Sequence, residues 1–189
     1  MNIGTYTMVK LYFLGVFKKQ GDDATLIDSA SDLSSFNFFQ RSSADDFLKF
    51  TSKMVVSRLE IATRTSIKEK EYMCHAFVRT DNTAVVVVSD EDYPSKAAHS
   101  ITLKILEDFP QCNLAAYLRK FQDPKEADSI TRLQAELDET KIILHSTIAN
   151  LLKRGEKLDD LVAKSEDLSS QSKLFYKTAK KTTRCCEIF

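Results

Sequence analysis

The longest regular pattern in the chain is a seam of residues spaced alternately by three and four positions, from Ile130 to Thr182. It has sixteen consecutive positions: ten apolar residues, five Ser or Thr, and Arg154 near the centre. Sustained heptads of this kind are typical of coiled coils. A continuous helix over residues 129–183 has a length of about 80 Å, which a domain of this size cannot cover, so we predict partner helices. The apolar seam residues are Ile130, Leu133, Leu137, Leu144, Leu151, Leu158, Leu161, Leu168, Phe175 and Ala179.

Arg154 is the exception in this seam. A guanidinium among apolar side chains is costly to desolvate unless other chains supply acceptors. In a parallel homodimer two Arg154 side chains would repel each other, whereas neutral amide side chains from different helices would satisfy one Arg and fix the register. The alternative is an Arg that snorkels at the edge of the seam. The neighbouring Gly155 lowers helix propensity by about 1 kcal/mol relative to Ala, which predicts poor helical order before partners bind.

The first two thirds of the chain alternate between strand-like and helix-like patterns. We predict strands over residues 8–17, 24–29, 35–40, 65–80 and 83–89, and helices over residues 43–60, 92–109 and 114–121. The strand at 83–89 is almost continuously apolar, which is typical of a strand covered on both faces. Asp123 and Pro124 then start the long helix. The expected fold class is α+β, with a five-stranded antiparallel sheet that carries helices on both faces.

Composition narrows the class of protein. The 189 residues allow one globular domain of about 120 residues plus an extended segment. The formal net charge is zero, so nothing in the overall charge supports nucleic-acid binding. No signal peptide, myristoylation site or apolar run of membrane-spanning length is present, and four Cys show no disulfide or zinc spacing. We expect a protein made and kept in the cytosol.

Catalytic and cofactor motifs are missing from the sequence. With four Gly the chain contains no phosphate-binding loop, which excludes a prenylated small GTPase. There is no nucleophile elbow, and His75, His99 and His145 have no ligand-like or triad-like companions along the chain. We predict no enzymatic activity, no metal and no cofactor.

The last five residues are Cys-Cys-Glu-Ile-Phe. Cys186 stands fourth from the end, as in the C-a-a-X prenylation pattern, and Phe at X favours geranylgeranyl by the general rule. One prenyl chain anchors a protein only marginally, so Cys185 is the candidate for palmitoylation or another second lipid. A chance terminal Cys is the alternative.

Several motifs carry a family resemblance. Residues 151–162, Leu-Leu-Lys-Arg-Gly-Glu-Lys-Leu-Asp-Asp-Leu-Val, resemble the centre of an R-SNARE motif with Arg154 as its ionic-layer arginine. Residues 71–79 and Tyr93-Pro94 resemble a longin domain, although the connection over residues 110–115 is shorter than in that family. With its terminal cysteines, the chain is similar to the prenylated longin-type R-SNAREs of the Ykt type, which lack a transmembrane helix.

This resemblance implies a domain organisation and a function. It implies a longin domain over residues 1–122, a linker over 123–128, an R-SNARE motif over 129–183 and a lipidated tail over 184–189. The motif would join three glutamine-bearing Q-SNARE helices in vesicle fusion, with a farnesyl group on Cys186, at the cytoplasmic face of membranes such as the Golgi and transport vesicles. A prenylated longin regulator or tether with an ordinary coiled coil is the alternative.

A cluster of aromatic residues is larger than one small sheet needs for its core. The family resemblance implies a closed state in which the domain binds its own SNARE segment, and these residues then form a groove for that segment and the prenyl group. The alternative is simple core packing. The residues are Phe36, Phe38, Phe39, Phe47, Phe50 and Met54.

Overall fold

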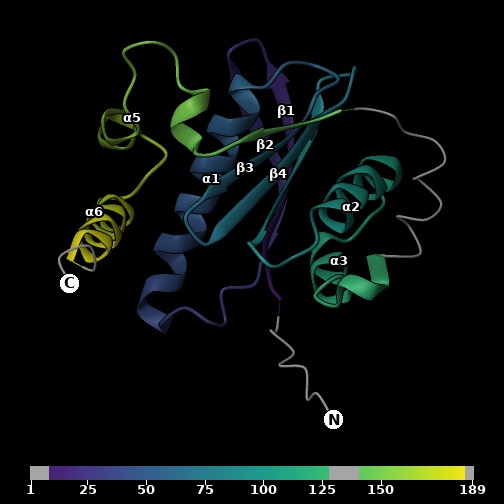
Figure 1. Cartoon of the computed structure of the whole chain (residues 1–189), viewed down its shortest axis with the longest axis horizontal. Coiled ribbons are helices and arrows are strands. Elements are labelled where there is room, and N and C mark those ends of the chain that lie inside the picture. Colours follow the sequence, from purple (N-terminus) through teal and green to yellow (C-terminus); the bar gives the residue numbers. More distant parts are fainter. Residues whose placement is uncertain (1–8, 128–140, 186–189) are drawn as a thin grey trace.

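The computed structural model describes residues 9–127 and 141–185 (Figure 1). We refer to residues 9–127 as the N-terminal domain and to residues 141–185 as the C-terminal segment. A sheet in the order β2-β1-β5-β4-β3-β6 forms the middle layer. Its strands are β1 (Leu11–Gln20), β2 (Asp23–Ser31), β3 (Arg64–Glu69), β4 (Tyr72–Val78), β5 (Thr83–Asp90) and β6 (Ile142–His145).

Helices cover both faces of this sheet. One face carries α1 (Arg41–Arg58), which follows the 3₁₀ helix η1 (Phe38–Gln40), and the other carries α2 (Ser95–Asp108) and α3 (Leu114–Lys120) (Figure 1). The apolar strand β5 serves both faces, as its pattern predicts: Val85 and Val87 belong to the core cluster under α2 and α3, and Val86 and Val88 to the cluster under α1. The α+β fold class with helices on both faces is therefore confirmed.

The sheet differs from the prediction in three places. Residues 35–40 form a turn and η1 instead of a strand, because Asn37 caps η1 by accepting a hydrogen bond from the Phe39 amide. The predicted strand 65–80 is two strands, β3 and β4, joined at Lys70, whose φ is 58°. A sixth strand, β6, pairs parallel with β3, so the sheet is mixed and six-stranded instead of antiparallel and five-stranded.

The short connection after α2 still lets α3 pack. The Phe109–Pro110 peptide is cis, and α3 begins four residues later with Asn113 as its cap. Leu114 and Leu118 are both buried in the core cluster on that face of the sheet. After α3, residues 124–127 are helical and Asp123 caps them through the Lys125 amide, as expected for a helix that starts here. The continuation of that predicted helix over residues 128–140 lies outside the described residues.

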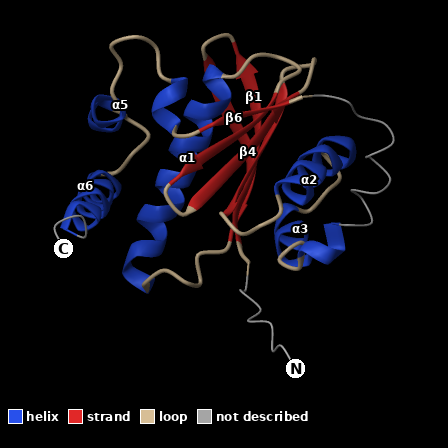
Figure 2. Cartoon of the chain, in the orientation of Figure 1, coloured by secondary structure: helices blue, strands red, loops and turns tan. Residues whose placement is uncertain are grey.

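The C-terminal segment is not one continuous helix, and that expectation is wrong for the described residues of this conformer. The segment begins with β6 at the edge of the sheet and continues on the α1 side as η2 (Ile148–Leu151), α5 (Leu158–Lys164) and α6 (Ser170–Cys185) (Figure 2). Gly155 has a φ of 86°, which no helix residue adopts, and it separates η2 from α5. A lone helix would leave its apolar seam in water, whereas short elements can bury apolar side chains on the domain. Ile130, Leu133 and Leu137 lie outside the described residues.

Candidate functional site

The interface between the C-terminal segment and the N-terminal domain brings together most of the residues that the sequence singles out. We call this arrangement the closed conformer. Ion pairs between the segment and the domain occur at three places among the described residues. They are Lys153–Asp22 (2.6 Å), Glu156–Arg58 (2.9 Å) and Asp167–Lys53 (3.1 Å).

These ion pairs are exposed to different degrees. The hydrogen bond from Lys153 is the largest cause that holds the pKa of the Asp22 carboxyl below its usual range, and the Asp167 hydrogen bond raises the pKa of Lys53. Exposed pairs of this kind contribute little because water and salt screen them. The pair between Arg58 and Glu156 is the least exposed of the three, so we expect it to contribute most.

Glu69 fixes the start of the interface. Its Oε2 accepts hydrogen bonds from Thr147 Oγ1 at 2.8 Å and from the Ile148 amide at 3.1 Å. Directly before this contact, β6 extends the sheet in parallel register with β3. The side chain of Ile148 is 7% exposed and belongs to the same core cluster as the buried residues of α1. The segment therefore completes the hydrophobic core on this face.

The residues that the closed conformer buries most deeply are not all seam residues. Ile148 and Val162 are buried, yet both stand one position after a seam residue, at heptad position e. Conversely Leu144, which belongs to the seam, is 70% exposed. Sequence reasoning missed Ile148 and Val162. One feature of the sequence could have pointed to these two residues. Ile148 and Val162 are fourteen residues apart, and Gly155 lies halfway between them at the same heptad position.

Arg154 is exposed on the turn between η2 and α5. The turn closes through hydrogen bonds from the Glu156 amide to the Lys153 carbonyl at 2.9 Å and from the Lys153 amide to Glu156 Oε2 at 2.8 Å. The closed conformer therefore leaves the guanidinium in water, where its charge carries no desolvation cost.

The remaining seam residues differ in how deeply they are buried. Leu168 is buried, Phe175 is half-buried, and Ala179 is exposed at the mouth of a groove. Three half-buried leucines pack against the core cluster under α1, namely Leu151, Leu158 and Leu161. The closed conformer thus covers part of the seam.

A groove of about 820 Å³ runs between α1, the sheet and α6. Phe47 on α1 stacks on Tyr176 of α6 with ring centroids 5.3 Å apart. Of the six residues proposed for a groove, Phe36, Phe39 and Phe47 line it. Phe50 and Met54 line a neighbouring depression together with Leu161, and Phe38 lines neither.

Asp159 ties α5 to α6 beside this groove. Its carboxylate accepts a 2.6 Å hydrogen bond from Tyr176 Oη and pairs with Lys180. Burial and this hydrogen bond raise the pKa of Tyr176, so its hydroxyl stays protonated. Further along α6, Cys185 is the last helical residue, and Cys186 lies outside the described residues.

A second polar cluster lies inside the domain. Ser66 Oγ is 2.9 Å from His75 Nδ1 and 2.8 Å from His99 Nε2, a contact between β3, β4 and α2 that the sequence does not reveal. Burial lowers the pKa of His75 to about 3 and that of His99 to about 4. All three side chains are at most 3% exposed, so no substrate reaches the hydroxyl. His145 lies on β6, where it pairs with Ile67, the residue after Ser66.

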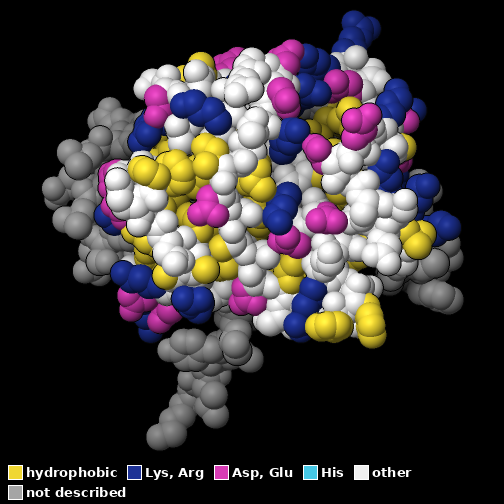
Figure 3. Space-filling view, turned by 180° about the vertical axis from the view of Figure 1, so that it is seen from behind, with side chains coloured by type: hydrophobic (Ala, Val, Ile, Leu, Met, Phe, Trp, Pro, Cys, Tyr) yellow, Lys and Arg dark blue, Asp and Glu magenta, His cyan; other side chains and the backbone are white. Residues whose placement is uncertain are grey.

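The surface adds two observations. Basic and acidic side chains are intermixed over the face in Figure 3, without a broad field of one sign. Within residues 9–127 and 141–185, no helix combines the length and the hydrophobicity that crossing a bilayer requires.

Comparisons with known proteins match both parts of the chain. The family model of synaptobrevin matches residues 129–187, and the longin model, described as a regulated-SNARE-like domain, matches residues 33–133. The chain is 44% identical to the synaptobrevin homolog YKT6 of Debaryomyces hansenii and 43% identical to that of Schizosaccharomyces pombe. It is 41% identical to the Saccharomyces cerevisiae protein of the same name, and each alignment covers 95% of this chain and 100% of the relative.

Proposed function

Because the chain belongs to the synaptobrevin family as a longin-type R-SNARE of the Ykt type, a non-enzymatic family of vesicle trafficking, we propose that it drives membrane fusion as the arginine-bearing helix of a SNARE bundle. In this proposal residues 129–183 form one helix in a parallel bundle with three Q-SNARE helices. Arg154 lies among three glutamines, and burial of the seam supplies the free energy for membrane work. The main support is that the sixteen-position seam coincides with the residues that match synaptobrevin.

The closed conformer is the resting form in this proposal. Leu158 and Leu161 pack on the core of the longin domain, so they are not free to enter a bundle until the segment detaches. Arg154 and Leu144 remain exposed, which leaves a place where Q-SNARE helices can begin to pair. The longin domain thereby delays assembly.

The proposal also includes lipids attached to the two C-terminal cysteines. Cys186 carries a prenyl group and Cys185 a second lipid, which together anchor the protein peripherally at the cytoplasmic face of Golgi and vesicle membranes. In the cytosolic form the groove lined by Phe47 and Phe175 covers the prenyl chain. Such cover is favourable because each exposed CH₂ group costs about 0.8 kcal/mol.

The experiment separates the two conformers with paired substitutions. Leu144→Asp places a charge in the bundle seam at a residue that is 70% exposed in the closed conformer, so assembly with Q-SNARE helices should be lost while the closed fold is kept. Ile148→Asp places a charge in the core under α1 but at heptad position e, where bundles tolerate charge, so assembly should persist and start faster. Leu158→Asp should abolish both the assembly with Q-SNARE helices and the closed conformer, because Leu158 belongs to the seam and packs on the core under α1.

Assembly is measured as the appearance of a heat-stable helical complex after the full chain is mixed with Q-SNARE helices. Lys141→Asp, an exposed substitution at the same heptad position as Ile148, is the matched control for charge on the segment. Normal assembly by the Leu144→Asp chain, or formation of a homo-oligomer through the seam, would favour an ordinary coiled-coil tether instead.

A further inference from the structure

Two phenylalanine side chains of η1 project into solvent. Among the described residues, Phe39 and Phe38 are the most exposed large hydrophobic side chains, at 87% and 74%. Their rings contact each other edge to face, with centroids 5.7 Å apart. The pair forms one continuous apolar knob, which we call the Phe38–Phe39 turn. Exposed aromatic surface of this kind marks an interaction site.

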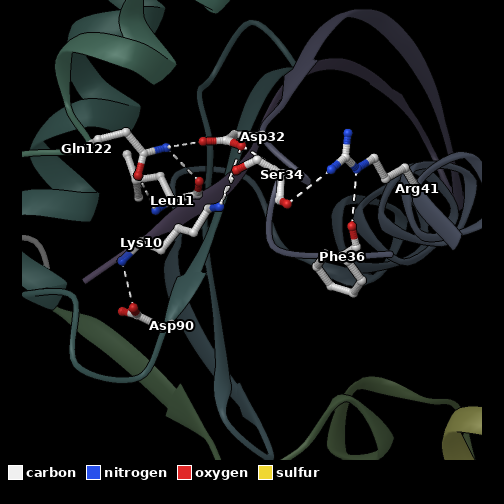
Figure 4. A network of polar contacts seen from close by, with 8 residues as sticks. All are labelled: Lys10, Leu11, Asp32, Ser34, Phe36, Arg41, Asp90 and Gln122. Atoms are coloured by element: carbon white, nitrogen blue, oxygen red, sulfur yellow. Dashed lines mark hydrogen bonds and ion pairs between the residues drawn. The ribbon is translucent and has the colours of Figure 1, made fainter. Parts of the chain in front are cut away.

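Hydrogen bonds hold this turn in one conformation. Asn37 Oδ1 accepts from the Phe39 amide at 3.2 Å. Arg41 reaches back from the start of α1 and donates from Nε to the Phe36 carbonyl and from Nη2 to the Ser34 carbonyl, both at 3.1 Å (Figure 4). The two rings are therefore presented outward by a braced turn.

The same network ties the turn to the rest of the domain. Lys10 Nζ, one residue before β1, donates to Ser34 Oγ at 2.8 Å, and Gln122 Nε2 after α3 donates to the Leu11 carbonyl at 2.8 Å (Figure 4). Asp32 accepts from Gln122 at 3.4 Å, which closes the network around the end of β2. The network thus connects the turn to β1, to the end of β2 and to the residues after α3.

The turn and α6 border the same groove. Phe39 and Gln40 line this groove, and so do Ala179 and Lys180 of α6. The sequence of α6 contains four Lys and one Arg, has no Asp or Glu, and ends at Cys185. One groove is therefore bordered by the aromatic turn and by the basic helix that carries a proposed lipid site. This combination is typical of segments that bind anionic lipid at the membrane interface.

We propose that the Phe38–Phe39 turn inserts into the interface of an anionic membrane leaflet and orients the longin domain on the membrane to which the C-terminus is anchored. The inference rests on the proposed function for the membrane attachment of the C-terminus alone. It adds a contact that belongs to the longin domain, and the basic residues of α6 supply the attraction to anionic lipid. One aromatic knob and one basic helix together fix an orientation, which a flexible lipid tail cannot do.

Tryptophan fluorescence tests the insertion because the chain contains no Trp. The full chain with Phe38→Trp is bound through a C-terminal His tag to vesicles with nickel-chelating lipid, with and without phosphatidylserine. Ile61→Trp is the control, since Ile61 is 48% exposed and follows α1, which separates it from η1 by about 27 Å. We expect a blue shift and quenching by brominated acyl chains for Trp at position 38 and neither for Trp at position 61.

Each other outcome overturns the proposal. An unchanged spectrum at position 38 on vesicle-bound protein shows that the turn stays in water. A blue shift without vesicles, on addition of a soluble prenyl analogue, shows that the turn closes over the groove instead. A shift that depends on protein concentration alone shows that a second copy covers it.

A single variant provides an independent readout. Phe38→Ser, at the ring of the pair that does not line the groove, should lower the partition of the untagged chain into phosphatidylserine vesicles by about fivefold, because interfacial binding scales with buried apolar area. The circular dichroism spectrum should be unchanged since the Phe38 side chain is exposed. Assembly with Q-SNARE helices should also be unchanged, so failure of this inference is distinguishable from failure of the proposed function. An unchanged partition contradicts the inference.

Discussion

At the scale of single residues, the buried contact of Ser66 with His75 and His99 makes the longin domain sensitive to acid. Burial is the main reason that the pKa values of His75 and His99 lie near 3 and 4, and a neighbouring ionisable side chain lowers each further, His99 for His75 and Arg64 for His99. An unfolded histidine has a pKa of about 6.5. Between the folded and the unfolded pKa values, the unfolded chain binds more protons than the folded chain. The free energy of unfolding therefore falls as the pH falls below about 6.5.

We therefore expect the free energy of unfolding to decrease by about 2–4 kcal/mol between pH 7 and pH 5, as measured by urea denaturation. His75→Gln removes one of the two titrating groups and should flatten this dependence, at some cost in stability at pH 7 because Ser66 loses a partner. Ile61→Gln, at an exposed residue that carries no titrating group, is the control and should keep the wild-type slope. Parallel pH profiles for His75→Gln and the wild type would show that the cluster is not responsible.

Single residues also show what the sequence can and cannot predict. Arg154 is conspicuous because a single cation interrupts a regular seam, and this signal depends only on the order of neighbouring residues along the chain. The Ser66 cluster is invisible there because its members come from β3, β4 and α2, and only the fold brings them together. The Phe38–Phe39 turn was missed for another reason: aromatic residues in a run favour a strand, and the Asn37 cap outweighs that propensity.

At the scale of elements, Gly155 is the point where the closed conformer and the proposed bundle helix exclude each other. Its φ of 86° strains any residue with a side chain, by about 1 kcal/mol or more. In a helix the same residue is about 1 kcal/mol worse than Ala. A glycine therefore lowers the free energy of the turn and raises that of the helix.

Gly155→Ala should shift the balance toward the helical form by about 2 kcal/mol, the sum of these two effects. We expect higher helicity of the free chain by circular dichroism and faster assembly with Q-SNARE helices. Gly21→Ala is a matched control, because Gly21 also has a positive φ, 61°, but lies in the turn between β1 and β2. Equal helicity and equal assembly rates for Gly155→Ala and the wild type would rule out this role for Gly155.

The helices of the domain are predictable from the spacing of their apolar residues. The burial of β5 on both faces is predictable from its nearly continuous apolar run. The C-terminal segment is not, because its sequence supports two structures. The seam predicts a helix for association with other chains, whereas Ile148 and Val162 at heptad position e bury in the closed conformer. The periodicity of the sequence therefore predicts the bundle helix, and only the packing against α1 reveals the closed conformer.

At the scale of the whole molecule, the closed conformer makes the chain compact. A compact chain of 189 residues has a radius of gyration of about 16 Å, and release of an 80 Å helix would increase it strongly. Ile148→Asp should increase the radius of gyration measured by small-angle X-ray scattering, since a carboxylate in the core under α1 is costly. Leu144→Asp should leave it unchanged because that side chain is exposed. Identical scattering from both variants would show that the Ile148 contact does not hold the segment in place.

The α+β class followed from the strand-like and helix-like patterns, and the division into domain and segment from the family resemblance, but neither predicted the balance between the two conformers. Family membership and the α+β domain rest on motifs that the sequence displays directly. The contact between the segment and the domain depends on pairs such as Glu69 with Thr147, which are 78 positions apart. Small differences between many such contacts decide which conformer is populated.

The parallel pairing of β6 with β3 has a consequence for solubility. While β6 is in place, the backbone groups of β3 are paired on both sides. If the segment leaves to join a bundle, β3 becomes an exposed edge strand whose backbone amides and carbonyls have no partners. A strand from another molecule can then pair with it. In the closed conformer the C-terminal segment thus shields β3 from aggregation. If the segment leaves to form the proposed bundle, a chain that finds no partners becomes prone to precipitate.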